Sequence, residues 1–242
     1  MEDKRFYGRR KGKPIKTSRQ RLIDELLPRV VFPKPIPDTI TDVRTIFGII
    51  PTEVWLEIGF GGGEHVAELA KRYPSVGIIG AEPFMNGVAT LLAHLNGSHM
   101  KQAVHTNLEE GRTDNVRIWP DDVRPLFPHF PSGVFERFFI LYPDPWPKAR
   151  HAERRFINQK NIPALARLIS EKGAVYLATD VADYAEWAKE QMDLSGLFQQ
   201  VHPDTTVPPP DWVPTRYERK GIAAGRHPTY LVFRKKNAIF KK

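Results

Sequence analysis

The chain has 242 residues, of which 41% are hydrophobic, and none is cysteine. The lack of cysteine excludes disulfides and thiolate metal sites, and no apolar run approaches the ~20 residues that a membrane-spanning helix needs. With 36 Lys and Arg against 28 Asp and Glu, the formal net charge is +8, which favours a polyanionic partner such as nucleic acid.

The length fits one α/β domain, residues 51–242, preceded by a basic arm and a wrapping segment, residues 1–50. The basic N-terminus is not followed by the apolar segment of a secretory signal. We therefore expect a cytoplasmic protein with no membrane partner.

The first 21 residues contain nine Lys or Arg residues and little apolar periodicity. We predict a mobile cationic arm that orders, if at all, on a phosphate backbone, and the alternative is a solvated tail that improves solubility. The run Leu22–Leu27 predicts a short helix. Prolines at 28, 33, 35 and 37 then predict an irregular segment that wraps the core.

A buried strand is predicted at Val54–Ile58, and a glycine-rich turn, Gly59–Gly63, follows it. The next apolar residues recur at helical spacing, at Val66, Leu69, Ala70 and Tyr73. Strand, glycine turn and helix open a doubly wound fold, in which glycine lets the backbone approach a ligand closely. We therefore predict a Rossmann-like α/β fold, with a seven-stranded, mostly parallel sheet and helices on both faces.

Acidic residues follow the predicted strands. The next three strands are predicted at Gly77–Ala81, Val116–Trp119 and Phe138–Tyr142. The acids at the carboxyl ends of the four strands are Glu57, Glu82, either Asp121 or Asp122, and Asp144. Because the carboxyl ends of parallel strands form the ligand-binding edge of an open sheet, we expect these acids to converge on one crevice rather than to act as solvated caps.

The loop after the fourth strand is stiff, because prolines occupy positions 143, 145 and 147. It carries Asp144, Trp146 and Lys148 within five residues, and the basic run Arg150–Arg155 follows. A carboxylate, a large aromatic ring and an ammonium group can together hold a flat polar substrate. The alternative is a connector in which Asp144 only caps a neighbouring element and Trp146 only packs.

The remaining elements alternate between helix and strand. One helix is predicted around Leu91, Leu92 and Leu95, and a second runs from Asn161 until Gly173 ends it. A strand at Val175–Leu177 leads to Thr179 and Asp180, and a helix with Tyr184, Trp187, Ala188 and Met192 follows. Two final strands are predicted near Phe198–Val201 and Tyr230–Phe233, joined by a long loop that contains Thr215–Gly221 and that we expect to be functional.

The glycine turn matches only the first half of the dinucleotide fingerprint G-x-G-x-x-G, since Glu64 occupies the third glycine position. Glu57, two residues before the first glycine, would repel a pyrophosphate but suits a cationic sulfonium that carries an amino-acid group. Glu82 suits ribose hydroxyls in either case. S-adenosylmethionine is therefore the predicted cofactor.

Several motifs follow one another along residues 50–235. They are Glu57–Gly63, Ala81–Pro83, Tyr142–His151 with Arg154 and Arg155, Ala178–Asp180 and Thr215–Glu218. In this order they resemble the tRNA (guanine-N7)-methyltransferases of bacterial type, and Pro-Asp-Pro-Trp-x-Lys-x-Arg-His is the most specific of them. Pro147 departs from the histidine more often expected there. The resemblance implies a methyltransferase that modifies N7 of a variable-loop guanine, guanine 46, in tRNA.

The resemblance also implies roles for individual residues. It implies cofactor binding by Glu57, Gly59, Gly61, Glu82, Asp122 and Asp144, with Asp144 as the catalytic residue. It implies substrate binding by Lys148, Asp180, Thr215, Arg216, Tyr217 and Glu218, and RNA contacts by Arg150, His151, Arg154 and Arg155. Asp122 fits better than Asp121 because it directly precedes Val123, where the family has a small apolar residue.

Two other functions fit the sequence less well. In an amino-group methyltransferase acting on adenine or cytosine, the aromatic residue follows Asp or Asn and two prolines, whereas Trp146 comes one position early. A non-catalytic basic RNA-binding protein would gain nothing from four carboxylates that face its ligand.

The histidines His65, His94, His99 and His105 lack the spacing of metal ligands, so we predict no metal site and treat them as surface or packing residues. The sequence leaves both a monomer and a homodimer open.

Overall fold

The computed structural model describes residues 8, 10, 12–33, 40–97 and 114–236. The predictions for most of the first eleven residues and for His99 and His105 lie outside these ranges. The chain divides into two compact units. The first is Met1–Pro131 with Val213–Arg216, and the second is Ser132–Trp212 with Tyr217–Lys242.

The first unit contains three parallel strands in the order β3-β2-β1. They are β1 (Glu53–Ile58), β2 (Val76–Ala81) and β3 (Val116–Trp119). Their register aligns Ile58 with Ala81 and Ala81 with Trp119, so the three carboxyl ends lie side by side. All three predicted strands are confirmed, and β1 and β2 each begin one residue earlier than predicted.

Helices α3 (Glu64–Arg72) and α4 (Met85–Leu95) follow β1 and β2. The turn before α3 depends on Gly63, whose φ of 75° lies in the left-handed region. A Cβ at Gly63 would lie 2.4 Å from the Cβ of Leu91 in α4, so only glycine allows the two helices to pack this closely.

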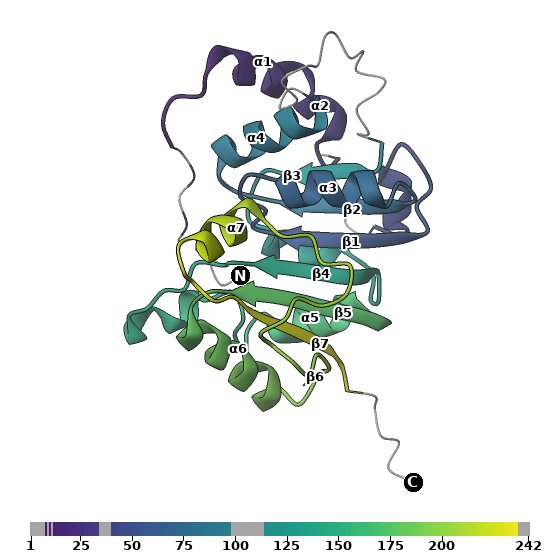
Figure 1. Ribbon diagram of the computed structural model, residues 1–242. Coiled ribbons are helices and arrows are strands. Elements are labelled where there is room, and N and C mark those ends of the chain that lie inside the picture. Colours follow the sequence, from purple (N-terminus) through teal and green to yellow (C-terminus); the bar gives the residue numbers. More distant parts are fainter. Residues whose placement is uncertain (1–7, 9, 11, 34–39, 98–113, 237–242) are drawn as a thin grey trace. The chain divides into compact units, whose positions relative to one another are not determined.

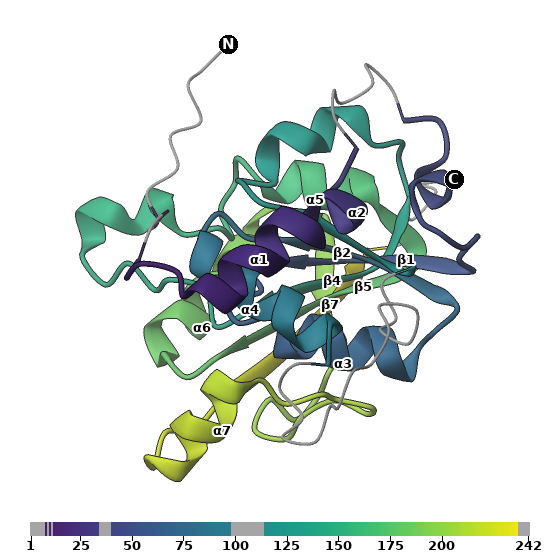
Figure 2. The same cartoon turned by 90° about the horizontal axis from the view of Figure 1, so that it is seen from above.

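The N-terminal segment differs from the predicted mobile arm. Residues Thr17–Glu25 form helix α1, which lies alongside α4, and Leu27–Val30 form the short helix α2 (Figures 1 and 2). The short helix predicted at Leu22–Leu27 was therefore misplaced. The prediction was wrong for residues 17–21 because contacts distant in sequence stabilise them; the guanidinium of Arg19, for example, donates a hydrogen bond to the Thr90 hydroxyl on α4.

The segment after α2 begins beside β3. Val31 forms an isolated parallel bridge with Ile118, and the backbone N–H of Phe32 donates to the Ile118 carbonyl. A 3₁₀ helix, η1 (Val43–Ile46), precedes β1, and a second, η2 (Arg124–His129), follows β3. The chain thus covers the outer edge of β3 before it enters the sheet.

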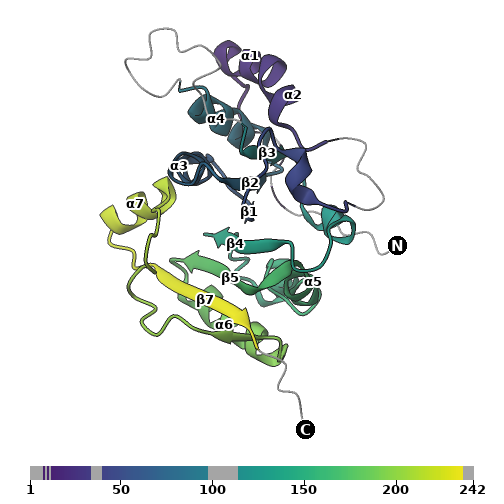
Figure 3. The same ribbon diagram turned by 90° about the vertical axis from the view of Figure 1, so that its right-hand side faces the viewer.

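The second unit contains four strands in the order β4-β5-β7-β6. They are β4 (Phe135–Leu141), β5 (Ile169–Thr179), β6 (Phe198–Gln200) and β7 (Thr229–Lys235). The β4–β5 pair is parallel, and β7 is antiparallel to both β5 and β6. Helices α5 (Ile162–Leu168) and α6 (Ala182–Leu194) pack against β5, and α6 also contacts β7 (Figure 3).

Two boundaries in this unit differ from the predictions. The helix expected to reach Gly173 ends at Leu168, because the β-branched Ile169 starts a strand that pairs with Phe135. The loop expected over residues 215–221 is instead largely helix α7 (Arg216–Ala223). The polar character of α7 hid it, since only Glu218 and Gly221 of its residues are buried.

Candidate active site

The first acid at the carboxyl edge of the first unit is Glu57 on β1. Its side chain is buried, and Oε2 lies 2.6 Å from Nδ1 of His65, which is buried as well. His65 is the second residue of α3, so the pair fixes the helix against the end of β1. His65 was expected to be only a surface or packing residue, and this hydrogen bond was not predicted.

The second acid, Glu82, directly follows β2 and binds the glycine turn. The backbone N–H of Gly61 donates to Oε2 at 2.7 Å, and that of Phe84 donates to Oε1 at 2.9 Å. The carboxylate therefore holds the turn after β1 and the chain after β2 in one arrangement. The two donors satisfy a carboxylate that is only 8% exposed.

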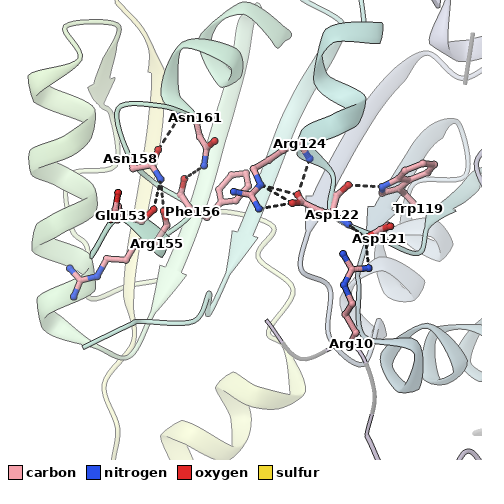
Figure 4. Close-up of polar contacts among 10 residues, drawn as sticks. All are labelled: Arg10, Trp119, Asp121, Asp122, Arg124, Glu153, Arg155, Phe156, Asn158 and Asn161. Carbon is pink, nitrogen blue, oxygen red and sulfur yellow. Dashed lines mark hydrogen bonds and ion pairs between the residues drawn. The ribbon is translucent and has the colours of Figure 1, made fainter. Parts of the chain in front are cut away.

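Asp121 and Asp122 follow β3 and have separate partners. The carboxylate of Asp122 accepts hydrogen bonds from the backbone N–H and the guanidinium of Arg124, and its side chain is only 10% exposed (Figure 4). Asp121 is 44% exposed and forms an ion pair with Arg10 at 2.8 Å. Arg10 thus brings the N-terminal segment to the same strand end, a contact that the sequence did not predict.

In the second unit, the loop after β4 carries Asp144. Tyr142 and Trp146, on either side, have φ values of 51° and 42°, in the region that non-glycine residues rarely adopt. Such strain persists only where surrounding contacts hold it, and it is frequent at functional sites. Asp144 itself is exposed to solvent.

Arg155 provides one of these contacts, which corrects the prediction that it binds RNA. Its side chain is 5% exposed, its Nε donates to the Pro145 carbonyl at 2.9 Å, and it forms an ion pair with Asp183. A buried guanidinium that is bound to the loop backbone is not available to phosphates, so we assign Arg155 to holding the loop. Trp146 packs against this same segment, with its ring 5.1 Å from the Arg154 guanidinium and 5.9 Å from the His151 ring.

The basic run is a 3₁₀ helix, η3 (Ala149–Arg154). Asn158 supports the chain that follows it, since its side chain donates to the Arg155 carbonyl and accepts from the Asn161 backbone N–H (Figure 4). Lys148 and Arg150 are exposed, and His151 and Arg154 are half-buried. These four residues remain candidates for RNA contact. Partial burial and the neighbouring cations Arg154, Arg150 and Lys148 lower the pKa of His151.

The remaining predicted substrate residues stand near α7. Asp180 follows β5 and forms an ion pair with Arg226. Glu218 is buried and accepts hydrogen bonds from Trp212 Nε1 at 3.1 Å and from the Tyr230 hydroxyl at 2.7 Å. Tyr217 is exposed, and its ring centroid lies 5.0 Å from that of Tyr142.

Glu218 therefore has partners within the protein, and its role in substrate binding stays a prediction. The pKa of Tyr142 is raised by burial of its hydroxyl and by the nearby charge of Glu218, so this phenol stays neutral. Of the other two residues of this motif, Thr215 is half-buried, and the exposed Arg216 donates its backbone N–H to the Glu64 carboxylate. Thr215 and Arg216 belong to the first unit, and Tyr217 and Glu218 to the second.

Comparison with known proteins decides the family. A family model described as "Putative methyltransferase" matches residues 51–231. The tRNA (guanine-N(7)-)-methyltransferase of Rhodospirillum rubrum is 42% identical over 97% of this chain and 89% of its own length. The enzyme of the same name from Ruegeria pomeroyi is 41% identical over 95% of this chain and 94% of its own length. The chain belongs to the tRNA (guanine-N7)-methyltransferase family.

Solved structures agree on the fold. A mutant 16S rRNA (adenine(1408)-N(1))-methyltransferase from Catenulisporales acidiphilia, solved with its cosubstrate SAM, aligns with a TM-score of 0.52 and 12% identity over 79% of this chain and 89% of its own. TrmN from Thermus thermophilus aligns with a TM-score of 0.50 and 15% identity over 77% of this chain and 45% of its own. The prediction of a Rossmann-like methyltransferase fold is thereby confirmed.

No helix among the described residues is long and apolar enough to cross a membrane. The same part of the chain holds no group of three or more His, Asp or Glu side chains arranged to bind a metal ion.

The hydrogen bond between His65 and Glu57 predicts a stability difference within α3. His65→Ala leaves a buried carboxylate without this partner, and it should lower the free energy of unfolding by about 1–3 kcal/mol in urea denaturation. Arg72→Ala, which removes an exposed ion pair with Glu68 from the same helix, should cost no more than about 0.5 kcal/mol. Equal losses of unfolding free energy in the two variants would mean that the buried hydrogen bond stabilises the protein no more than the exposed ion pair does.

Proposed function

We propose that the protein transfers a methyl group from S-adenosylmethionine to N7 of guanine in tRNA, at guanine 46 of the variable loop. The observation that carries the proposal is the near full-length similarity to enzymes named for guanine-N7 methylation of tRNA. The geometry of each unit supports it independently.

The end of the first unit's sheet fits the proposed cofactor. A Cβ added at Gly59 or Gly61 would meet no atom within 4 Å, so the glycine turn leaves room for a ligand against its backbone. Glu57, Glu82 and Asp122 lie at or just after the carboxyl ends of neighbouring strands, and an acidic edge suits a sulfonium and its amino group and does not suit a pyrophosphate. Glu82 can still accept hydrogen bonds from ribose hydroxyls, because each carboxylate oxygen has two lone pairs.

Held by Glu57, Glu82 and Asp122, S-adenosylmethionine would supply a methyl group on positively charged sulfur. N7 of guanine would bond to the methyl carbon as the carbon–sulfur bond breaks, and the neutral thioether would be the leaving group. N7 has an in-plane lone pair and no proton, so the chain needs no general base before the transfer. The modified ring carries a positive charge, and a carboxylate beside it stabilises the transition state more than the ground state. We assign this electrostatic role to Asp144.

The surface of η3 suits the RNA backbone. Side chains cannot reach N7 in the deep, narrow major groove of A-form RNA, so the target guanine must lie outside regular helix and leave its stack. A variable loop meets this condition. Lys148, Arg150, His151 and Arg154 then contact phosphates, which fixes the position of the tRNA without reading its sequence.

The direct test is to incubate the protein with labelled S-adenosylmethionine and bulk tRNA, and to map the modified base. The proposal requires 7-methylguanine at position 46. Methylation of an exocyclic amino group would favour an amino-group methyltransferase, and tight tRNA binding without any transfer would favour a non-catalytic RNA-binding protein.

Asp144→Asn should separate binding from chemistry. It removes the negative charge with little change in size, so we expect tRNA binding to be retained and kcat to fall by about 10²–10³-fold. Single-turnover rates with saturating tRNA measure the effect. Asp193→Asn, an exposed substitution at the end of α6, serves as the control, and a turnover as high in Asp144→Asn as in this control would remove the proposed role.

The joint substitution of Arg150 and Arg154 by alanine should weaken tRNA binding. Two lost phosphate contacts should reduce the slope of log affinity against log salt by about two, and the affinity for the cofactor should not change. Joint replacement of Lys172 and Arg234 removes the same charge elsewhere in the second unit and should leave the salt slope intact. A loss of cofactor affinity in the variant without Arg150 and Arg154 would show that η3 contributes to cofactor binding rather than to RNA binding.

The low pKa of His151 predicts that tRNA binding depends on pH. In the free protein this pKa lies below its ordinary value of 6.5, and RNA phosphates should raise it in the complex. The affinity for tRNA should therefore increase as the pH falls through the pKa that His151 has in the complex. It should level off below the pKa that His151 has in the free protein. Filter binding from about pH 8 to about pH 5.5 measures this, and His151→Gln should flatten the curve. An unchanged curve would remove His151 from the interface.

A further inference from the structure

His65 is a polar residue at a position where packing alone favours an apolar one. Four residues of α3 are buried, and His65 is the only polar residue among them; the others are Val66, Leu69 and Ala70. A buried imidazole loses its hydration, so it needs a hydrogen-bond partner that offsets this cost. Glu57 is that partner, because its Oε2 atom lies 2.6 Å from Nδ1 of His65 and both side chains are only 2% exposed.

Helix α3 has other anchors, so it does not need His65 merely to stay in place. The helix contacts β2 and α4, and Val66 and Leu69 are buried on it. Gly63 fixes the start of the helix, because a larger residue there would collide with Leu91. An apolar residue in place of His65 would leave these contacts intact but would remove the donor from the carboxylate. The specific effect of His65 is therefore on that carboxylate.

The two carboxylate oxygens of Glu57 have different surroundings. Oε2 faces Nδ1 of His65, whereas no residue in the described part of the chain forms a hydrogen bond with Oε1. Oε1 is also not among the fully enclosed atoms that lack a partner in the described ranges, so it keeps contact with solvent. Because an ionised carboxylate only accepts hydrogen bonds, Nδ1 is the nitrogen that carries the proton.

We propose that His65 is a positioning residue for the cofactor: its hydrogen bond to Oε2 of Glu57 orients Oε1 to accept the ammonium group of S-adenosylmethionine. The inference rests on the proposed function and adds to it the residue that orients the acid. A glutamate side chain can adopt several rotamers, and a fixed donor selects one of them before the ligand binds. A charge-assisted hydrogen bond to an ammonium group depends on such geometry.

An imidazole suits this task better than a cationic side chain does. Lysine or arginine at position 65 would place a full positive charge beside the acid, and this charge would compete with the ammonium group of the ligand. A neutral imidazole still donates one N–H group, so it can orient Glu57 without that competition. The glycine turn that follows Glu57 leaves room for a ligand, since a Cβ at Gly59 would meet no atom within 4 Å.

The experiment measures binding, with two ligands that differ only in the amino group. S-adenosylhomocysteine carries the ammonium group on a molecule whose sulfur is neutral, and its deamino analogue has hydrogen in place of the amino group. Titration calorimetry with the full chain gives the dissociation constant of each ligand. The wild type should bind the deamino analogue at least about tenfold more weakly, because the contact with Glu57 is lost.

Two substitutions separate the Nδ1 donor from the bulk of the ring. The amide nitrogen of asparagine can lie where Nδ1 lies, whereas that of glutamine reaches the position of Nε2. His65→Gln should weaken binding of S-adenosylhomocysteine about tenfold and change the affinity for the deamino analogue less than about twofold. His65→Asn should bind both ligands within about threefold of the wild type. Arg72→Ala, on the exposed side of the same helix, is the control and should match the wild type with both ligands.

An equal loss of affinity for both ligands in His65→Gln would mean that the substitution disturbs the whole turn, and it would overturn the positioning role. Wild-type affinity for S-adenosylhomocysteine in His65→Gln, or a loss in His65→Asn, would overturn it as well. If His65→Gln does not fold, His65→Asn and the wild type still provide the test.

The wild type also separates this inference from the proposed function. Equal affinity of the wild type for the two ligands would show that the amino group does not contact Glu57. That result would refute this inference alone. Failure of the wild type to bind S-adenosylmethionine, together with an absence of 7-methylguanine in the tRNA assay, would refute the proposed function and this inference with it.

Discussion

The carboxylate of Glu82 is the contact on which the first unit's ligand-binding edge depends. It accepts the backbone N–H groups of Gly61 and Phe84, and so joins the turn after β1 to the segment that starts α4. Gly61 has a φ of 56°, a conformation that costs nothing for glycine but needs fixing by a partner. In the proposed cofactor site, Glu82 would therefore hold the turn in position before the cofactor binds, which reduces the ordering that binding requires.

Buried polar contacts serve the same purpose in the second unit. The Arg155 guanidinium binds the Pro145 carbonyl next to Asp144, and the Glu218 carboxylate joins Trp212 to Tyr230. Arg155 fixes the backbone of the loop after β4, whereas Glu218 joins side chains from the segments before and after α7. The exposed residues beside them, Asp144 and Tyr217, are then presented on chain that is already held in position.

The sequence predicted the elements whose signal is local. The strands β1 to β3 are rich in apolar residues, and the turn at Gly59–Gly63 has glycines where the backbone requires them. Helix α7 was missed and α1 was misplaced, because α1 has no buried residue and α7 buries only Glu218 and Gly221. α1 contacts the distant helix α4, and periodicity cannot report such a contact.

The position of the acids at the strand ends was predicted, but their partners within the protein were not. Glu57, Glu82 and Asp122 stand at strand ends, where a pattern of strand followed by acid identifies them. His65 is eight residues from Glu57, and Arg10 is far from Asp121 in sequence, so no short motif links either pair. Arg155 was misassigned because a run of basic residues gives no sign of which one turns inward.

The central claim is that acids at the ends of parallel strands bind a cationic methyl donor. Titration calorimetry of S-adenosylmethionine with Glu82→Gln tests it most directly, with Asp24→Asn on α1 as a control of equal charge change. The account predicts an affinity at least about tenfold weaker for Glu82→Gln, because a charged acceptor of the ligand's donors is lost, and an unchanged affinity for the control. Wild-type affinity in Glu82→Gln would contradict it.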